Sequence, residues 1–309
     1  MKDHELPGSI FTQPWWLDIV APKQWEDIQI KKGEEIFARM PIVKIKRKGF
    51  NMIEMPILTH KMGPWIKETS PKQERRHSNE RKLLQELIDE LPEVDYFSYN
   101  LDTNIQNFLP FVWKGFEQSS LSTFKFEFPF QLEELWKGMK SSVRRGIKRA
   151  KEELSLDSQL SISEAYELIE KTFTRQNIRP PFSENILERI FQEANSRNRI
   201  SIIGARDKQN KLVASQVYIH DDDCTYYIAG GIDSDSNVAG LASYLIWEGI
   251  NIAHSKNNSF DFEGSSIQSI ENFFSTFGAK HCHYHRIYSV SKRFAPFYYG
   301  KKLIQRLKF

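Results

Sequence analysis

The spacing of apolar and polar positions divides the chain into strand-like and helix-like stretches. Near the N-terminus apolar and polar residues alternate with the period of two that strands show, and turns at Lys32-Gly33 and Lys48-Gly49 separate the runs. This pattern predicts an antiparallel meander after a short helix that begins at Thr12. The predicted strands of the meander are Trp25–Ile30, Glu35–Lys46 and Phe50–Met55.

Helical spacing appears next, because leucines and isoleucines recur every three or four residues between Glu74 and Leu91. A capping box from Ser161 to Glu164 opens a later helix, and Pro180-Pro181 separates that helix from the following one. The other elements predicted before residue 198 are strands at Val94–Tyr99 and Thr123–Phe128 and helices at Asn104–Leu109, Leu132–Met139, Ser141–Glu153 and Ser183–Arg197.

The last third of the chain has a regular order of elements. A hairpin formed by Leu212–His220 and Cys224–Ile232 leads into a helix at Gly240–His254. Further strands are predicted at Arg199–Ala205, Ser259–Phe262 and Ala279–Tyr288, and a helix at Ile267–Phe277. The whole pattern predicts a fold of the α/β (α+β) class with two lobes, each a mixed, mostly antiparallel sheet flanked by helices.

Composition supports two folded lobes and limits the classes of function. The chain has 309 residues, of which 40% are hydrophobic, and this length exceeds that of a usual single domain. A net charge of +3 is mild for a dedicated nucleic-acid binder. The two cysteines, Cys224 and Cys282, offer neither a thiolate zinc site nor a disulfide framework. No run approaches the roughly 18 apolar residues of a spanning helix, so we expect a cytoplasmic protein and leave peripheral membrane contact open.

The segment that leads from the hairpin into the next helix carries the most distinctive chemistry. Gly230 and Gly231 fall near the end of a strand, where paired glycines indicate a bulge or a closely approached backbone. The turn Asp233–Ala239 then feeds a helix whose first amides have no helical acceptor. Such amides, together with the helix dipole, favour a pyrophosphate at this helix start.

Within this turn, Asn237-x-x-Gly240-x-Ala242 resembles the pyrophosphate loop of GNAT acyltransferases, which usually begins with Gln or Arg. The resemblance implies that Asn237, Gly240 and Ala242 hold the pyrophosphate of an acyl-CoA co-substrate. It also implies that the amides around Gly230 and Gly231 bind the pantetheine and polarise the thioester carbonyl. No permanently bound cofactor is expected.

Two further stretches resemble the Fem-type peptidoglycan transferases and their BioF2-like relatives. They are the basic helix Val143–Lys151 and the strand and helix from Phe260 through Ser265 to Gly278. These proteins pair two GNAT-like lobes, which implies an N-terminal lobe at 1–130, a basic linking helix at 131–160 and a C-terminal acyltransferase lobe at 161–309. Phe274 stands where Fem-type proteins usually carry a lysine linked to the aminoacyl ester, and this departure disfavours charged tRNA as the donor.

Several side chains are candidates for catalysis and substrate binding. Glu263 is the candidate general base, and Asp261 shares its face of the predicted strand, so that the two carboxylates would raise one pKa. Tyr226 and Tyr227 lie on opposite faces of the hairpin strand, and one of them could protonate a leaving thiolate or line the acceptor pocket; Tyr227 is the candidate for catalysis. Arg145 and Arg149, one helical turn apart, are candidates for a substrate phosphate.

Two groups of residues have plainer interpretations. The alternating His281, His283 and His285 are nearly 7 Å apart along one strand, which is poor geometry for a shared metal, and no metal site is predicted. The tail 292–309 mixes cations with aromatic residues. That mixture suits an anionic membrane surface or single-stranded nucleic acid, although we expect its aromatic residues to dock on the core.

Three functions remain open at this point. The first is N-acyl transfer from an acyl-CoA-type thioester to an amine, on a small molecule or a lipid-linked acceptor such as an amino sugar or cell-envelope precursor. The second is Fem-type aminoacyl transfer from tRNA to a peptidoglycan precursor. The third is a non-catalytic ligand-binding module on the same fold. A monomer and a homodimer are equally compatible with the sequence.

Overall fold

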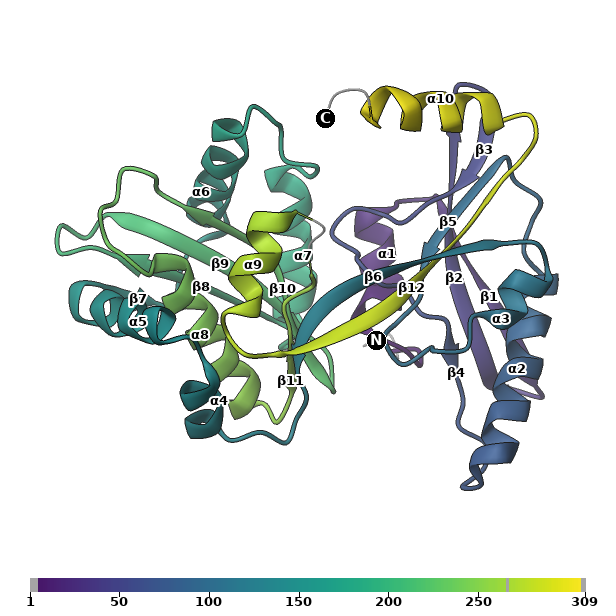
Figure 1. Ribbon diagram of the computed structural model, residues 1–309, viewed down its shortest axis with the longest axis horizontal. Helices are drawn as coiled ribbons and strands as arrows, with labels where there is room; N and C mark the ends of the chain where they lie inside the picture. The colour runs from purple at the N-terminus through teal and green to yellow at the C-terminus, as the bar shows by residue number, and fades with distance from the viewer. Residues whose placement is uncertain (1–4, 265–266, 307–309) are drawn as a thin grey trace. The chain divides into compact units, whose positions relative to one another are not determined.

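The computed structural model describes residues 5–264 and 267–306, so Ser265 and Phe309 of the stretches named above lie outside the described residues. The chain forms two compact units (Figure 1). Unit 1 comprises Met1–Leu121 and His283–Phe309, and unit 2 comprises Ser122–Cys282.

Unit 1 is built on an antiparallel meander with one parallel pair. In sheet order it contains β1 (Trp25–Lys32), β2 (Glu35–Arg47), β3 (Phe50–Ile53), β5 (Tyr96–Asn100) and β12 (Lys280–Val290), with the short β4 (Trp65–Ile66) beside β2. The strands β3 and β5 are parallel, and the other pairs of this unit are antiparallel. Its helical segments are η1 (Ile10–Thr12), α1 (Pro14–Val20), α2 (Gln73–Asp89), α3 (Leu109–Trp113) and α10 (Ala295–Arg306).

One buried cation ties the N-terminal segment to this sheet. Arg39 is fully buried, and its Nε donates to Asp27 Oδ2 at 3.0 Å. Its Nη1 and Nη2 donate to the carbonyls of Pro7 and Thr12 at 2.9 and 2.8 Å. Because a buried charge is tolerated only when paired and hydrogen-bonded, this set of acceptors accounts for its burial.

Unit 2 is a mixed sheet with helices on both faces. Its strand order is β6 (Glu117–Phe126), β11 (Ser259–Asp261), β10 (Cys224–Ile232), β9 (Leu212–His220), β8 (Ile200–Arg206) and β7 (Ser155–Asp157). Among the described residues of this unit, only the β10–β11 pair is parallel. Figure 1 shows α6 (Ile162–Arg175) and α7 (Glu184–Ser196) on one face and α8 (Leu241–Ser255) on the other. The remaining helices of this unit are α4 (Leu132–Gly138), α5 (Ser141–Glu153) and α9 (Gln268–Ser275).

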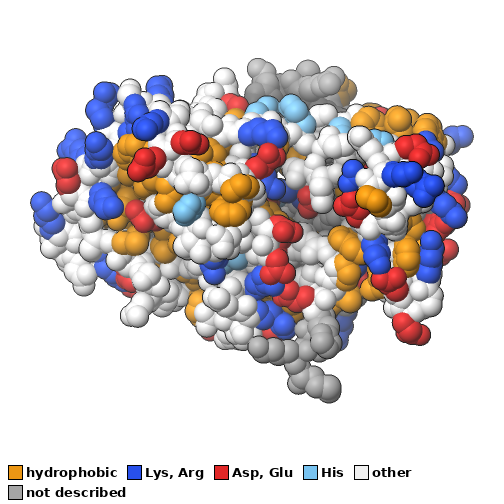
Figure 2. Space-filling model, turned by 90° about the horizontal axis from the view of Figure 1, so that it is seen from below, with side chains coloured by type: hydrophobic (Ala, Val, Ile, Leu, Met, Phe, Trp, Pro, Cys, Tyr) orange, Lys and Arg blue, Asp and Glu red, His pale blue; other side chains and the backbone are white. Residues whose placement is uncertain are grey.

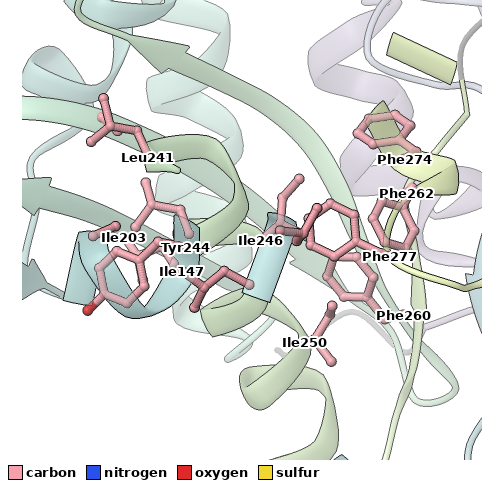
Figure 3. Packing of buried hydrophobic residues seen from close by; sticks show 14 of the residues in the cluster. Ile147, Ile203, Leu241, Tyr244, Ile246, Ile250, Phe260, Phe262, Phe274 and Phe277 are labelled. Atoms are coloured by element: carbon pink, nitrogen blue, oxygen red, sulfur yellow. The ribbon is translucent and has the colours of Figure 1, made fainter. Parts of the chain in front are cut away.

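The core of unit 2 lies between the sheet and the helices α5, α8 and α9. Figure 3 shows Ile147 of α5 among residues of α8, and four phenylalanines grouped nearby. Phe262 has ring contacts with Phe274 and Phe277 at 5.1 and 5.4 Å between centroids. Since each aromatic side chain buries a large apolar area, this cluster fixes the segment after β11 against α9.

The predicted fold class is confirmed: the protein is a mixed α/β structure with mostly antiparallel sheets flanked by helices. The predicted hairpin and the helix after it are present, as β9, β10 and α8. The capping box of α6 is also present, with Ser161 Oγ accepting from the backbone N–H of Glu164.

The division of the chain differs from the predicted boundaries at 130 and 160. The segment 131–160 is no linker, because Val143, Ile147 and Ala150 of α5 are buried in the core of unit 2. The segment 283–309 belongs to unit 1, since Phe294 packs against Phe50 of β3 at 4.9 Å between ring centroids. Both assignments depend on contacts between residues distant in sequence, which local spacing does not reveal.

Two local predictions are also wrong. The short helix expected at Asn104–Leu109 begins instead at Leu109, where Pro110 occupies the first turn at no cost in hydrogen bonds. The strand expected at Thr123–Phe128 begins instead at Glu117. Its first residues are mostly polar and are exposed or half-buried, so the apolar pattern did not indicate that they belong to a strand. Within residues 5–264 and 267–306, no helix combines the length and apolar composition of a membrane span.

Candidate functional site

A bulge in β10 lies two residues before the glycine pair at which the sequence predicted an irregular strand. The register with β9 passes from Tyr227 opposite Tyr218 to Ala229 opposite Val217, so Ile228 is the extra residue. The pairing of β10 with β11 is confined to Cys224–Tyr226 in the described part of the chain, and it ends with Tyr226 opposite Asp261. Because β11 ends there, the rest of β10 has no neighbouring strand on this side among the described residues.

The two strand glycines serve different contacts. A Cβ on Gly231 would lie 2.2 Å from the carbonyl carbon of Leu168, so this position faces the backbone of α6. A Cβ on Gly230 would lie 2.5 Å from the hydroxyl of Tyr227. Close packing against α6 therefore accounts for Gly231, whereas Gly230 makes room for Tyr227 at the bulge. Their predicted role in binding pantetheine stays a prediction.

Gly240 marks the N-terminus of α8, and a neighbouring helix explains its need for glycine. It has φ +88°, and a Cβ there would lie 2.4 Å from the carbonyl carbon of Gly146 in α5. Gly240 was predicted to hold a pyrophosphate, and that role stays a prediction; the backbone that lies against it is that of the basic helix. Arg145 is the chain neighbour of Gly146, the residue in contact with the start of α8.

The turn before α8 is stabilised by its first residue. The carboxylate of Asp233 accepts from the backbone N–H of Asp235 at 3.0 Å and from Lys211 Nζ at 2.6 Å. The hydrogen bond from Lys211 holds the pKa of Asp233 below its ordinary value. Asn237 is exposed, and Ala242, half-buried, accepts from Gln216 Nε2 at 3.4 Å through its carbonyl. The predicted helix-start cradle is thus a defined turn with Asn237 open to solvent.

The two candidate carboxylates differ in environment, although both are buried. Asp261 Oδ1 accepts from Thr123 Oγ1 at 2.6 Å and from the backbone N–H of Glu263 at 2.8 Å. Glu263 lies beyond the end of β11 and has φ +60°, a conformation that is strained for a residue with a side chain. Asp261 therefore holds the turn that presents Glu263, so the two do not share a strand face as predicted.

Tyr227 lies at the bulge with an apolar ring as its neighbour. Burial raises its pKa to about 12, so the hydroxyl keeps its proton at neutral pH. Phe274 contacts Tyr227 at 6.2 Å and Phe262 at 5.1 Å between ring centroids. The residue at the usual lysine position of Fem-type proteins is therefore a core aromatic side chain next to the candidate acid.

The arginines of α5 differ in their hydrogen-bond partners. Arg144 folds back on α4, where its Nη1 donates to the carbonyl of Lys137 at 3.3 Å. Arg149 is exposed, and its Nε donates to Glu153 Oε1 at 2.7 Å, so it is already engaged in a surface ion pair. Arg145 is exposed. The predicted role of Arg145 and Arg149 in binding a phosphate stays a prediction.

Several contributing residues were not identified from the sequence. The ion pair of Lys211 and Asp233 stabilises the turn. Thr172 Oγ1 accepts from the backbone N–H of Ile232 at 3.1 Å. Gly146 has no side chain, so the backbone of Gly240 can pack against it. Asp at the start of a polar turn is a recognisable signal for such a hydrogen-bonded turn. The contributions of Thr172 and Gly146 depend on helix placement and have no local signal.

Two of the alternating histidines contact aromatic rings. His281 contacts the ring of Phe124 at 5.0 Å, and His285 contacts that of Phe108 at 4.5 Å between centroids. His285 Nδ1 lies 2.9 Å from Gln118 Nε2. In residues 5–264 and 267–306, no group of three His, Cys, Asp or Glu side chains is arranged to hold a metal ion.

Comparisons with known proteins agree with this arrangement. Residues 137–265 match the family model described as the acetyltransferase (GNAT) domain. This segment contains the bulged strand, the turn, α8 and the strand after it. Among curated proteins, no sequence matches the chain.

Solved structures share the fold over nearly the whole chain. The crystal structure of FemX has a TM-score of 0.67 at 9% identity, covering 91% of this chain and 92% of that one. The structure of L-PGS from Bacillus licheniformis has a TM-score of 0.55 at 10% identity, covering 94% and 90%. A conserved protein of unknown function from Bacteroides thetaiotaomicron has a TM-score of 0.52 at 10% identity, covering 82% and 86%. Residues 137–265 are therefore similar to the acetyltransferase (GNAT) domain, and the chain shares the fold of the FemX structure over most of its length.

Proposed function

We propose that this protein is an N-acyltransferase that moves an acyl group from a thioester of the acyl-CoA type to an amine. The acceptor would be a small-molecule or lipid-linked amine, such as an amino sugar or a cell-envelope precursor. The observation that supports this proposal is that β10 loses its neighbouring strand β11 after the Tyr226–Asp261 pair, next to the bulge at Ile228. It lies inside the segment that matches the GNAT domain.

The donor would bind along the open edge of β10. Backbone groups of a strand edge without a neighbour are free to bond the amides of pantetheine, as an added strand would. The pyrophosphate would lie at the N-terminus of α8, where the first amides lack helical acceptors and the dipole is positive. Arg145 would add a cation beside that point, since Gly146 contacts Gly240.

The reaction would use the two side chains at the bulge and beyond β11. Glu263 accepts a proton from the acceptor ammonium, and the free amine then attacks the thioester carbonyl. Backbone amides of the bulge stabilise the negative oxygen of the tetrahedral intermediate. The carbon–nitrogen bond forms, and the positively charged nitrogen of the intermediate releases its second proton to solvent. The carbon–sulfur bond then breaks, and Tyr227 gives its proton to the departing thiolate. Amide and free thiol are the products, and the proton held by Glu263 reprotonates Tyr227 through solvent.

The test is direct detection of transfer. The protein is incubated with acetyl-CoA or a long-chain acyl-CoA and with a panel of amino sugars and amino-acid amines, and released thiol and new amide are measured. The proposal predicts both products, with release reduced at least about 10²-fold in Glu263→Gln. Absence of binding by every acyl-CoA at millimolar concentration would reject the thioester donor.

A second candidate is aminoacyl transfer from tRNA, which the architecture shared with FemX favours. Neutralised phosphates release counterions, so binding of tRNA by α5 would weaken steeply with salt. Lys and Arg are interspersed with Asp and Glu on the face seen in Figure 2, and Phe274 provides no cation at the aminoacyl ester. These two observations rank the thioester donor above charged tRNA.

A further inference from the structure

The C-terminal helix α10 (Ala295–Arg306) is apolar on the face that docks on unit 1. Its Tyr298 ring lies 5.5 Å from that of Tyr96, and Phe294 just before the helix lies 4.9 Å from Phe50 between centroids. These contacts join a small cluster that includes Met52. The sequence predicted that the aromatic residues of this tail dock on the core, and these contacts show that docking on one side of the helix.

The opposite face of α10 is also apolar and faces solvent. Pro296, Tyr299, Gly300 and Leu303 follow the spacing i, i+3, i+4, i+7 that places residues on one helical stripe, and all four are exposed. Tyr299 is 52% exposed and Leu303 is 61% exposed. Phe297, 62% exposed, borders this stripe. A surface helix normally turns polar residues to water, so a second apolar face indicates that something else covers it.

The segment of the chain that carries the stripe has charges of one sign. The last acidic residue of the chain is Glu271, and the 38 residues that follow contain eight Lys and Arg. The turn between β2 and β3 lies at the start of α10, because Arg293 Nη2 donates to the carbonyl of Gly49 at 2.8 Å. Lys46 and Lys48 on either side of that turn are exposed.

The acids close to this turn are already neutralised. Glu54 pairs with Arg47 at 3.0 Å, and Asp95 pairs with Arg293 at 3.6 Å. The stripe therefore combines exposed aromatic and aliphatic side chains with a cationic border. A lipid surface that carries anionic headgroups matches both features, since apolar side chains enter the boundary of the acyl chains while cations remain at the headgroups.

We propose that the outer face of α10, with the β2–β3 turn beside it, binds the surface of an anionic lipid bilayer. A second copy of the chain fits less well, because it would bring two acid-free cationic segments together at cost. Single-stranded nucleic acid would stack on aromatic rings, but Pro296 and Leu303 offer no stacking face. This proposal is independent of the transfer reaction, which concerns unit 2.

The test is flotation with vesicles of phosphatidylcholine alone and of phosphatidylcholine with one quarter phosphatidylglycerol. The full chain is expected to float with the anionic vesicles, and raised salt is expected to weaken that binding. Tyr299→Ser combined with Leu303→Ser is expected to lower the partition coefficient at least about tenfold, and Lys46→Glu with Lys48→Glu to lower it similarly. Ile178→Ser, at a residue of unit 2 that is 50% exposed, is the matched control and should bind as the unchanged chain does.

Thermal melting of each variant establishes that folding is intact, which is expected because the replaced side chains are exposed. Equal flotation with both vesicle types, or binding unaltered in Tyr299→Ser/Leu303→Ser, would overturn the proposal. So would absence of flotation together with a dimer in light scattering that the same variant abolishes, since the stripe would then be covered by a second copy.

Discussion

Gly240 at the start of α8 lies directly against Gly146 of α5, so that a Cβ on Gly240 would come within 2.5 Å of the Gly146 carbonyl oxygen. This contact couples the basic helix to the helix start that we expect to hold phosphate. The first prediction is that Gly240→Ala loses both stability and donor binding. A left-handed φ costs a residue with a Cβ about 1–2 kcal/mol, and the clash with α5 adds to that cost.

Gly115→Ala is the matched control for this prediction. Gly115 has the same φ, +88°, but nothing lies within 4 Å of a Cβ placed there. Urea unfolding should therefore show a larger loss of unfolding free energy for Gly240→Ala than for Gly115→Ala. Equal losses in the two variants would mean that the contact with Gly146 contributes nothing.

Glu263 is predicted to act in the proton transfer and Asp261 in positioning. Glu263→Gln should lower kcat by about 10²–10⁴-fold with little change in KM or in melting temperature. Asp261→Asn should instead lower the melting temperature, because Asp261 binds both Thr123 and the backbone of Glu263. Glu248→Gln, at a half-buried carboxylate of α8, serves as the control with unchanged kcat.

Tyr227 is predicted to donate a proton to the leaving group. Tyr227→Phe should lower kcat by about tenfold, a small effect for acid catalysis because a thiolate leaves readily. The neighbouring Tyr226 bonds Asp221 through its hydroxyl at 2.9 Å, so Tyr226→Phe should keep kcat within about twofold. Similar rates for the two variants would remove Tyr227 from the mechanism.

His220 is predicted to set part of the acid sensitivity of unit 2. It is buried between Ser201 and Thr225, and burial lowers its pKa to about 3. In the unfolded chain the ordinary value near 6.5 applies, so the unfolded state gains a proton as the pH falls below about 6.5 while the folded state does not. Stability should therefore fall with decreasing pH from about 6.5 to about 3, by up to about 1.4 kcal/mol per pH unit.

The variant His220→Gln checks this origin. It should be less stable at pH 7.5, where the hydrogen bonds of the neutral imidazole are complete, but its stability should vary less with pH across the same window. Denaturant unfolding at several pH values measures both quantities. An unchanged slope would show that other groups cause the acid sensitivity.

Local spacing was sufficient for the hairpin, the bulge and α8, because alternation and helical periodicity act over a few residues. The reasons for the glycines were not accessible in this way: Gly231 meets α6 and Gly240 meets α5, and both contacts arise from helices distant in the sequence. Glu263 was placed on a strand face by alternation, whereas the hydrogen bond from its backbone to Asp261 turns the chain after β11. The residues that form the apolar outer face of α10 could not be recognised from the sequence, because the structure is needed to show which face of the helix docks on unit 1.

Backbone hydrogen exchange in the presence of acetyl-CoA tests the central claim most directly. If the donor binds along the open edge of β10 with its pyrophosphate at α8, saturating acetyl-CoA should slow exchange of the amides at 228–232 and 241–243. Protection should be lost in Gly240→Ala and should be unaltered in Gly115→Ala. Unchanged exchange at those amides, or protection confined to other segments, would contradict the assignment of this site.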